Sequence, residues 1–426
     1  MRFEARLMAS SMALCCGAAA LAQRVSFELI PFALGANDLS PDGRYVVGDA
    51  DWDGDHFSDG AYLRDFVTGE VTEINVVVDP STTVPVTAVS NDGQFVLGTI
   101  PDPNDPNAGG AVGNVAARWR ADTETWQSLG YLPNAGFCPS RSDGYEISAD
   151  GSVAVGLSWD GCSGRAYRWT QETGMVELQV LANGGNRASV VSDDGAIIGG
   201  FAQGTQSRTP AVWYADGSGE LLDPPNGVAI GEIHGVSDDG TILLGEWLTT
   251  EFSTRASKWT GGRAGWTREQ IADGSLFPGW SGIPTDVADD GAIVGFDFLI
   301  GQRRAWIQPQ GTGPILDLKT YIQSHGGTVP SGLTLEVCQA ISRDGRFIIG
   351  HGFGTGAWRV TILSDCTGDI TGDGAVGLED LSLMLAAFGT CAGEAGFNSG
   401  ADLDADLCVT LADLAIQLGA FGTSCD

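Results

Sequence analysis

Side chains with oxygen atoms recur at short, fixed intervals near the C-terminus, in the segment 369–380. Positions 1, 3, 5, 7 and 12 of this segment hold Asp369, Thr371, Asp373, Ala375 and Asp380. Ala375 would supply its backbone carbonyl, and the other four would supply side-chain oxygens. Ca²⁺ takes about six to eight oxygen ligands and suits this donor set, while Gly374 at position 6 permits the sharp bend. The spacing therefore predicts a calcium-binding loop, and the apolar residues after it predict a short helix over 381–388.

The same pattern returns 33 residues later. Its candidate ligands are Asp402, Asp404, Asp406, Cys408 and Asp413, and Cys408 would bind through its backbone carbonyl. Leu407 stands at position 6, where glycine makes the bend, so we expect this loop to be the weaker site. The segment 365–426 holds eleven acidic residues and no Lys, Arg or His, and its two loop-helix units favour a small calcium-dependent module over a solvated acidic tail.

A third acidic segment, 49–59, crowds five carboxylates into eleven residues. Alternating Asp residues around Gly54 could hold Ca²⁺, although Gly60 falls at position 12. A solvated acidic loop is the other interpretation.

Sequence patterns for catalysis are absent from this chain. Its four histidines are scattered and lack metal-ligand spacing, and the chain has no nucleophile elbow, phosphate-binding glycine loop or zinc pattern. We therefore expect a protein without catalytic activity.

One phrase recurs seven times and defines the elements that carry these segments. It reads Ser-x-Asp-Gly, followed by an apolar run that ends at a Gly, and it begins at Ser40, Ser90, Ser148, Ser192, Ser237, Ala288 and Ser342. Its Asp-Gly pairs lie 50, 58, 44, 45, 51 and 54 residues apart, which is the period of a four-stranded propeller blade. Each copy predicts a hairpin at the Asp-Gly turn and two further strands.

A large aromatic residue recurs in the third strand of each unit. These residues are Trp119, Trp169, Trp213, Trp259, Trp306 and Trp358, with Ala61-Tyr62-Leu63-Arg64 in the first copy. We expect them to fill the space between neighbouring sheets.

The last copy lacks a fourth strand, and the segment 25–30 resembles one. If it completes the last unit, the ring closes and no sheet edge stays exposed. The predicted fold is therefore all-β: a seven-bladed β-propeller over 23–363, closed by the N-terminal strand, followed by the calcium-binding module over 364–426.

The N-terminus predicts export. Arg2 and Arg6 precede an apolar stretch that ends in a small-x-small cleavage site, so residues 1–22 are interpreted as a signal peptide. Export favours disulfides: Cys138 with Cys162 in the propeller, and pairs among Cys366, Cys391, Cys408 and Cys425, with Cys338 unpaired. The net charge of −32 argues against nucleic acid and anionic membranes as partners.

Two family resemblances follow from these motifs. Residues 366–426 resemble dockerin type I modules, whose paired calcium loop-helix segments match 369–388 and 402–421. The resemblance implies attachment to a cohesin domain, often in assemblies that degrade polysaccharides. The partner-selecting positions 10 and 11 hold Leu378-Glu379 and Leu411-Ala412 rather than the small hydroxylated pair common in cellulosomal members.

Residues 25–363 resemble the extracellular HAF-repeat family, whose units combine a Ser-x-Asp-Gly hairpin with a later His-Ala-Phe-x-Trp segment. The best match is Arg165-Ala166-Tyr167-Arg168-Trp169, with Arg in place of His. The HAF-repeat family has no assigned biochemical activity, so this resemblance implies none for the propeller.

The leading hypothesis is a secreted, non-catalytic binding or scaffold protein. Its propeller would present a face to a glycan or protein ligand, and its calcium-loaded module would attach it to a cohesin-like partner. The alternatives are an enzyme or accessory protein of extracellular polysaccharide breakdown and a structural surface-layer protein. An enzyme predicts converging carboxylates or a Tyr and Arg set near the central channel, which a binding protein does not require.

Overall fold

The computed structural model describes residues 25–74, 85–102, 104, 113–133, 140–159, 163–204, 208–222, 230–248, 253–362, 367–371 and 375–423. The expected signal peptide lies outside these ranges, as do Asp373, Cys138, Cys162, Cys366 and Cys425.

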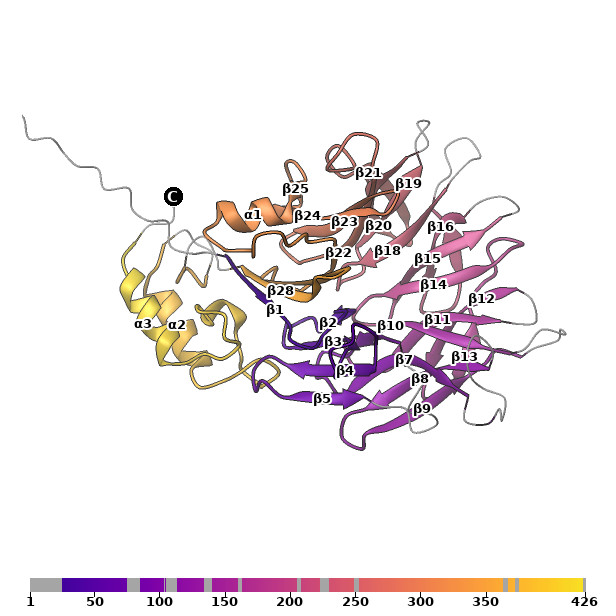
Figure 1. Cartoon of the computed structure of the whole chain (residues 1–426), viewed down its shortest axis with the longest axis horizontal. Coiled ribbons are helices and arrows are strands. Elements are labelled where there is room, and N and C mark those ends of the chain that lie inside the picture. Colours follow the sequence, from indigo (N-terminus) through magenta and orange to yellow (C-terminus); the bar gives the residue numbers. More distant parts are fainter. Residues whose placement is uncertain are drawn as a thin grey trace, which may run out of the picture.

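Seven four-stranded antiparallel sheets form the body of the protein (Figure 1). Blades 1 to 3 are β2 (Asp38–Leu39), β3 (Tyr45–Ala50), β4 (Gly60–Asp65), β5 (Val71–Ile74); β6 (Val86–Val89), β7 (Phe95–Pro101), β8 (Asn114–Arg120), β9 (Thr125–Gly130); and β10 (Ser142–Ile147), β11 (Val153–Trp159), β12 (Gly164–Thr170), β13 (Gly174–Glu177). Blades 4 and 5 are β14 (Asn186–Val191), β15 (Ile197–Gln203), β16 (Arg208–Tyr214), β17 (Gly219–Leu221); and β18 (Gly231–Val236), β19 (Ile242–Leu248), β20 (Thr254–Gly262), β21 (Gly265–Gln270).

Blades 6 and 7 complete the ring. They are β22 (Ser281–Val287), β23 (Ile293–Leu299), β24 (Gln302–Gln308), β25 (Leu316–Asp317); and β26 (Val337–Ile341), β27 (Phe347–Gly352), β28 (Gly356–Ile362), β1 (Val25–Leu29). A short helix, α1 (Leu318–Ser324), joins the two blades.

The predicted closure is confirmed. Strand β1 pairs antiparallel with β28, from Val25 opposite Ile362 to Leu29 opposite Trp358. The first strand of the described chain therefore forms the outer strand of the last blade, and the propeller has seven blades.

The Ser-x-Asp-Gly phrase forms a hydrogen-bonded turn. In the first copy the Ser40 hydroxyl donates to Asp42 (2.7 Å), and the same Asp42 oxygen accepts from the Arg44 amide (3.0 Å). The Ser40 Oγ also accepts from the Tyr45 amide (2.8 Å), which starts the next strand. Gly43 has a φ of +78°, a conformation that favours glycine, so the phrase fixes a tight hairpin at each blade.

The recurring aromatic residues lie in the core, as expected. All six tryptophans of the repeat are at most 4% exposed, and Tyr62 takes this place in blade 1. Their position relative to the preceding strand differs between blades. Trp306 and Trp358 lie opposite Gly295 and Gly350, whereas Trp213 lies opposite Ile198.

The C-terminal segment forms two helices, α2 (Leu378–Ala387) and α3 (Leu411–Ala420), beside blades 1 and 7 (Figure 1). Helix α2 begins three residues before the predicted start, because the Asp380 carboxylate accepts the Gly377 amide (2.6 Å) and caps the first turn. The predicted apolar face is divided: Met384 is buried, whereas Leu385 and Phe388 are 56% and 41% exposed.

One disulfide, Cys391 to Cys408, lies among the described residues, and Cys338 is free and buried, as predicted. Within the described ranges no helix is long and apolar enough to cross a membrane.

Candidate functional site

The central channel contains a cavity with a volume of about 550 Å³. It is lined by the first strand of every blade: β2, β6, β10, β14, β18, β22 and β26. In Figure 1 these strands, among them β10, β14 and β18, lie towards the middle of the ring. The variable residues of these seven strands therefore decide what the channel can bind.

One end of the channel is narrowed by the Ser-x-Asp-Gly turns. The amide of the second phrase residue donates to the carbonyl of its equivalent in the next blade at five junctions: Asn91 to Ala149 (2.8 Å), Ala149 to Asp193 (3.2 Å), Asp193 to Asp238 (3.2 Å), Asp289 to Arg343 (2.8 Å) and Arg343 to Pro41 (2.8 Å). Arg343 also reaches across this end to form ion pairs with Asp193 and Asp238. A ligand would therefore enter from the opposite end.

Three carboxylic acids lie in the channel near the narrowed end. Asp38, Glu146 and Asp286 each stand two residues before the phrase of their blade, and each is partly exposed to the channel. Asp38 accepts the Val89 amide of the next blade (2.7 Å), and Asp286 accepts the equivalent Ile341 amide (2.9 Å). Two of the three thus also link neighbouring blades.

The pKa values of these three carboxyl groups are raised in the channel. Burial raises the pKa of Asp38 to about 7, and the nearby charge of Asp286 adds to the rise. Burial likewise raises the pKa of Asp286 to about 7, and burial together with the charges of Asp38 and Asp286 raises the pKa of Glu146 well above its usual range. Among the described residues none of the three forms an ion pair with a Lys, Arg or His. Near neutral pH the group can therefore both donate and accept hydrogen bonds.

The open end carries a mixed set of charged and aromatic side chains. Arg187 and Glu232 are the second residues of β14 and β18 and form an ion pair, and Arg208 also binds Glu232 (2.9 Å). The Arg187 guanidinium lies over the ring of Tyr145, 4.9 Å from its centroid. His234 pairs with Glu246 next to this group. The entrance thus combines an aromatic surface with fixed polar groups.

These channel residues were missed by the sequence analysis. A signal did exist, because aligning the seven phrases places Asp38, Glu146 and Asp286 at one shared position where the other copies have Ala, Val or Gly. The position looks unremarkable in any single copy, and only ring closure brings the three together. Both features that we expect of an enzyme, converging carboxylates and a Tyr with an Arg, are present in the channel.

The predicted second calcium loop brings its carboxylates together. Ligand oxygens of Asp402, Asp404, Asp406 and Asp413 lie within 4.8 Å of one another and could hold a metal ion. Asp413 accepts the Leu403 amide (2.6 Å), which ties position 12 of the loop to position 2. The fifth candidate, Cys408, forms the disulfide through its side chain.

The first loop is described only in part. The Thr371 hydroxyl donates to Asp380 (2.9 Å) and lies 3.3 Å from Asp369, so three of its predicted ligands are neighbours. Ala375 follows the gap at 372–374, and Asp373 lies within it.

The acidic segment 49–59 forms a self-contained turn. Asp51, Asp53 and Asp59 also lie within 4.8 Å of one another. Asp51 accepts the amides of Gly54 (2.6 Å) and His56 (2.9 Å), so its carboxylate has a structural role without a metal. Both interpretations of this segment stay open.

Comparison with known proteins finds no matching family model and no matching curated protein. Solved structures are similar at low identity. An oligogalacturonate lyase from Vibrio parahaemolyticus is 12% identical, with 79% of this chain and 97% of that chain covered and a TM-score of 0.49. The β-propeller domain of the Trilobed protease from Pyrococcus furiosus is 11% identical, covering 75% and 91%, with a TM-score of 0.47.

TolB from Acinetobacter baumannii is 14% identical, with 75% and 80% covered and a TM-score of 0.39. Likenesses at this level concern the propeller fold and carry no argument about activity.

Proposed function

We propose that this protein is a ligand-binding propeller with a calcium-dependent attachment module. The observation that carries the proposal is the channel, which is narrowed at one end by the turns and lined by three carboxylic acids that have no basic partner within the described part of the chain. Each of the three already accepts a backbone amide, and the part of each carboxyl group that is exposed to the channel offers further hydrogen bonds to a ligand.

The chemistry of the channel favours a hydroxyl-rich ligand such as a short glycan. Carboxyl groups with a pKa of about 7 donate and accept hydrogen bonds, as sugar hydroxyls do. Thr87 and Gln339 add neutral polar groups, and Tyr145 at the entrance offers an aromatic surface. A volume of about 550 Å³ is typical of small-molecule sites.

The ligand can be identified by screening the full-length protein on a glycan array at pH 6 to 7. We expect retention of one glycan class, and the double variant Asp38→Asn with Asp286→Asn to change its affinity at least tenfold. An array without any retained glycan, or a ligand indifferent to this variant, would contradict binding in the channel.

The module is proposed to bind Ca²⁺ through Asp369, Thr371, Asp373, Ala375 and Asp380 and through Asp402, Asp404, Asp406, Cys408 and Asp413. The clustered carboxylates of the second loop support this, as does the spacing of both. We also propose that residues 366–426 form a dockerin-like module and that residues 25–363 are related to the HAF-repeat family. Export through the signal peptide over residues 1–22 is part of the same proposal.

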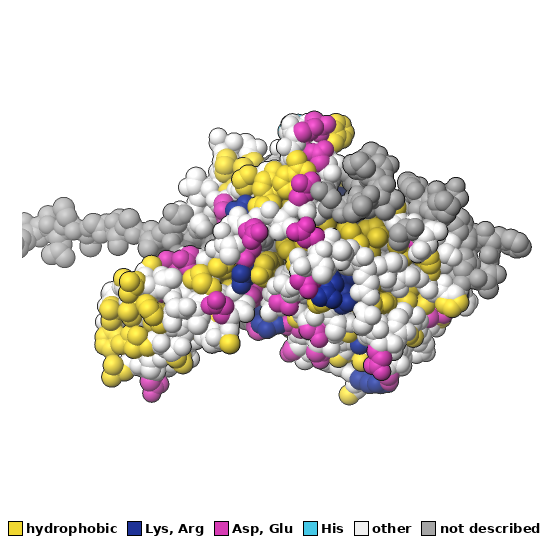
Figure 2. Space-filling view, turned by 90° about the horizontal axis from the view of Figure 1, so that it is seen from below, with side chains coloured by type: hydrophobic (Ala, Val, Ile, Leu, Met, Phe, Trp, Pro, Cys, Tyr) yellow, Lys and Arg dark blue, Asp and Glu magenta, His cyan; other side chains and the backbone are white. Residues whose placement is uncertain are grey.

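An exposed apolar face is the proposed attachment surface for a cohesin-like protein. Helices α2 and α3 expose equivalent residues 33 positions apart: Leu378 and Leu411, Leu385 and Leu418, and Phe388 and Phe421, between 41% and 74% exposed. Figure 2 shows hydrophobic side chains gathered on the module at the left of the molecule. Such a patch is typical of a protein interface.

A second candidate function is glycoside cleavage, as in polysaccharide breakdown. The raised pKa values of Asp38 and Asp286 favour it, because a carboxylic acid that is still protonated near pH 7 can act as a general acid. Incubation of the full-length protein with the retained glycan distinguishes the two. New reducing ends that Glu146→Gln abolishes would indicate an enzyme, and an intact glycan would indicate a binding protein.

A further inference from the structure

The contact between the module and the propeller involves the second calcium loop itself. We propose that the surface of blades 1 and 7 completes this loop, so that calcium binding at 402–413 and docking of the module on the propeller are thermodynamically coupled. This inference rests on the proposed calcium binding of the module and adds a role for the propeller in it.

Leu407 is the link between the loop and the propeller. It stands where a calcium loop normally has Gly and adopts a φ of +69°, a left-handed conformation that is unfavourable for leucine. Its side chain is 2% exposed and belongs to the cluster that contains Phe347 and Ile349 of β27 and Val46 of β3. Burial against the propeller therefore compensates for the strained backbone.

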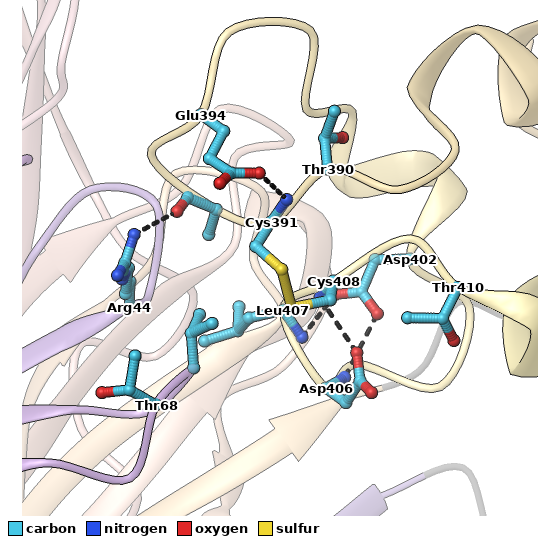
Figure 3. The surroundings of a disulfide bond; sticks show 12 residues. Arg44, Thr68, Thr390, Cys391, Glu394, Asp402, Asp406, Leu407, Cys408 and Thr410 are labelled. Atoms are coloured by element: carbon cyan, nitrogen blue, oxygen red, sulfur yellow. Dashed lines mark hydrogen bonds between the residues drawn. A yellow bond between two sulfur atoms is a disulfide. The ribbon is translucent and has the colours of Figure 1, made fainter.

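The neighbouring backbone is fixed in the same place (Figure 3). The Ala392 amide donates to the Leu407 carbonyl (2.8 Å), and the Cys391–Cys408 disulfide joins the same two segments. Arg44 of the propeller donates from Nη1 to the Ala392 carbonyl (2.5 Å), while its other nitrogens hold Asp65. The bend is thus connected to blade 1 through Ala392.

A second arginine holds the first ligand of the loop. Arg346 donates from Nη1 to the Ser399 carbonyl (2.6 Å) and lies 3.4 Å from Asp402 Oδ2. The same Oδ2 accepts the Leu407 amide (3.0 Å). Outer partners of this kind orient a metal ligand, so Arg346 is a positioning residue for the proposed site.

The two loops therefore differ in what they need. The first loop has Gly374 at the bend, and Thr371 and Asp380 hydrogen-bond within the module. The second loop has Leu407, which requires a buried surface to stay in its left-handed conformation. A propeller that stabilises the calcium-competent loop raises its affinity, and calcium tightens docking by the same factor.

Hydrogen exchange of the full chain tests the coupling, because it resolves the 402–409 segment from the first loop. We compare the wild type with Arg44→Met, which removes the bond to Ala392 without touching a calcium ligand. We expect Arg44→Met to speed exchange of 402–409 without calcium and to raise the calcium concentration for half-protection about three- to tenfold. Arg120→Met, which removes an exposed arginine of blade 2 paired with Asp122, is the matched control and should change neither.

A double-mutant cycle with Leu407→Gly tests the bend as the link. Glycine adopts the left-handed conformation without the propeller, so Arg44→Met should no longer change calcium protection in this background. Equal sensitivity to Arg44→Met in both backgrounds would overturn the inference, as would an unchanged half-protection concentration in Arg44→Met alone. Absence of calcium protection in the wild type would instead refute calcium binding, so the two failures are distinguishable.

Discussion

Asp38, Glu146 and Asp286 share one repeat position, and two of them combine two roles. Asp38 and Asp286 accept amides of the next blade and so help to hold the ring together. All three also leave acidic groups in the channel, where burial raises their pKa values and neighbouring carboxylates add to the rise at Asp38 and Glu146. A carboxyl group whose pKa is raised on folding takes up protons in the native state, and its ionisation opposes folding.

We therefore predict that the stability of the propeller falls as pH rises from about 4 to 8. The native state binds more protons than the unfolded state in this range, so the free energy of unfolding decreases with pH. Because the groups reach channel water, we expect a loss on the order of 1 kcal/mol for each. Urea denaturation at several pH values measures it.

The variant Asp38→Asn with Asp286→Asn provides the control for this prediction. Removing two of the titrating groups should flatten the pH dependence and raise stability at pH 8 relative to the wild type. If the stability of the variant falls with pH as steeply as that of the wild type, titratable groups other than Asp38 and Asp286 cause the pH dependence.

Calcium binding can be tested at single ligands in the full chain. Asp413 is buried and accepts three amides of the loop, so Asp413→Ala should remove the second calcium site while the first remains. Calorimetric titration should show one binding event fewer than the wild type. Asp53→Ala, in the separate acidic segment 49–59, is the control and should leave the number of binding events unchanged. Loss of a binding event in this variant would show that calcium binds in the segment 49–59.

At the scale of elements, the ring depends on β1. Val25 is 1% exposed and packs in the cluster shared by blades 6 and 7, whereas Ser26 next to it is exposed. We predict that Val25→Asp lowers the free energy of unfolding by about 3 kcal/mol, because it buries an unpaired charge at the seam. Ser26→Ala should be neutral within about 0.5 kcal/mol. Thermal unfolding measures both, and a neutral Val25→Asp would contradict the closure.

The elements follow closely from the sequence, because each blade carries its own hairpin signal. The Ser-x-Asp-Gly phrase, the apolar run and the aromatic residue act locally, and the fourth strand that the seventh copy lacks points to the segment 25–30. The channel residues do not follow, since Glu146 and Asp286 belong to different blades and meet only after closure. The bend at Leu407 likewise depends on packing in the cluster that contains Phe347, about 60 residues away in the chain.

At the scale of the whole molecule, the channel and the attachment face lie on separate parts of the chain. The exposed residues of α2 and α3 belong to the module, and the channel belongs to the seven inner strands. This separation would allow the protein to hold the proposed ligand and the proposed partner at once.

The attachment face predicts calcium-dependent binding of a purified type I cohesin domain. Leu385→Ser with Leu418→Ser should weaken it at least tenfold, because these side chains are each 56% exposed on equivalent turns. The variant should leave ligand binding in the channel unchanged. Surface plasmon resonance with and without EGTA measures the first effect, and wild-type protein that fails to bind would remove cohesin as the partner.

Ligand binding in the channel is the central claim, and a crystal of the full-length protein soaked with the glycan retained on the array tests it most directly. We predict electron density for the glycan in the channel, against Tyr145 and the group formed by Asp38, Glu146 and Asp286. Density on the outer strands of a blade or on the module, with the channel empty, would contradict it.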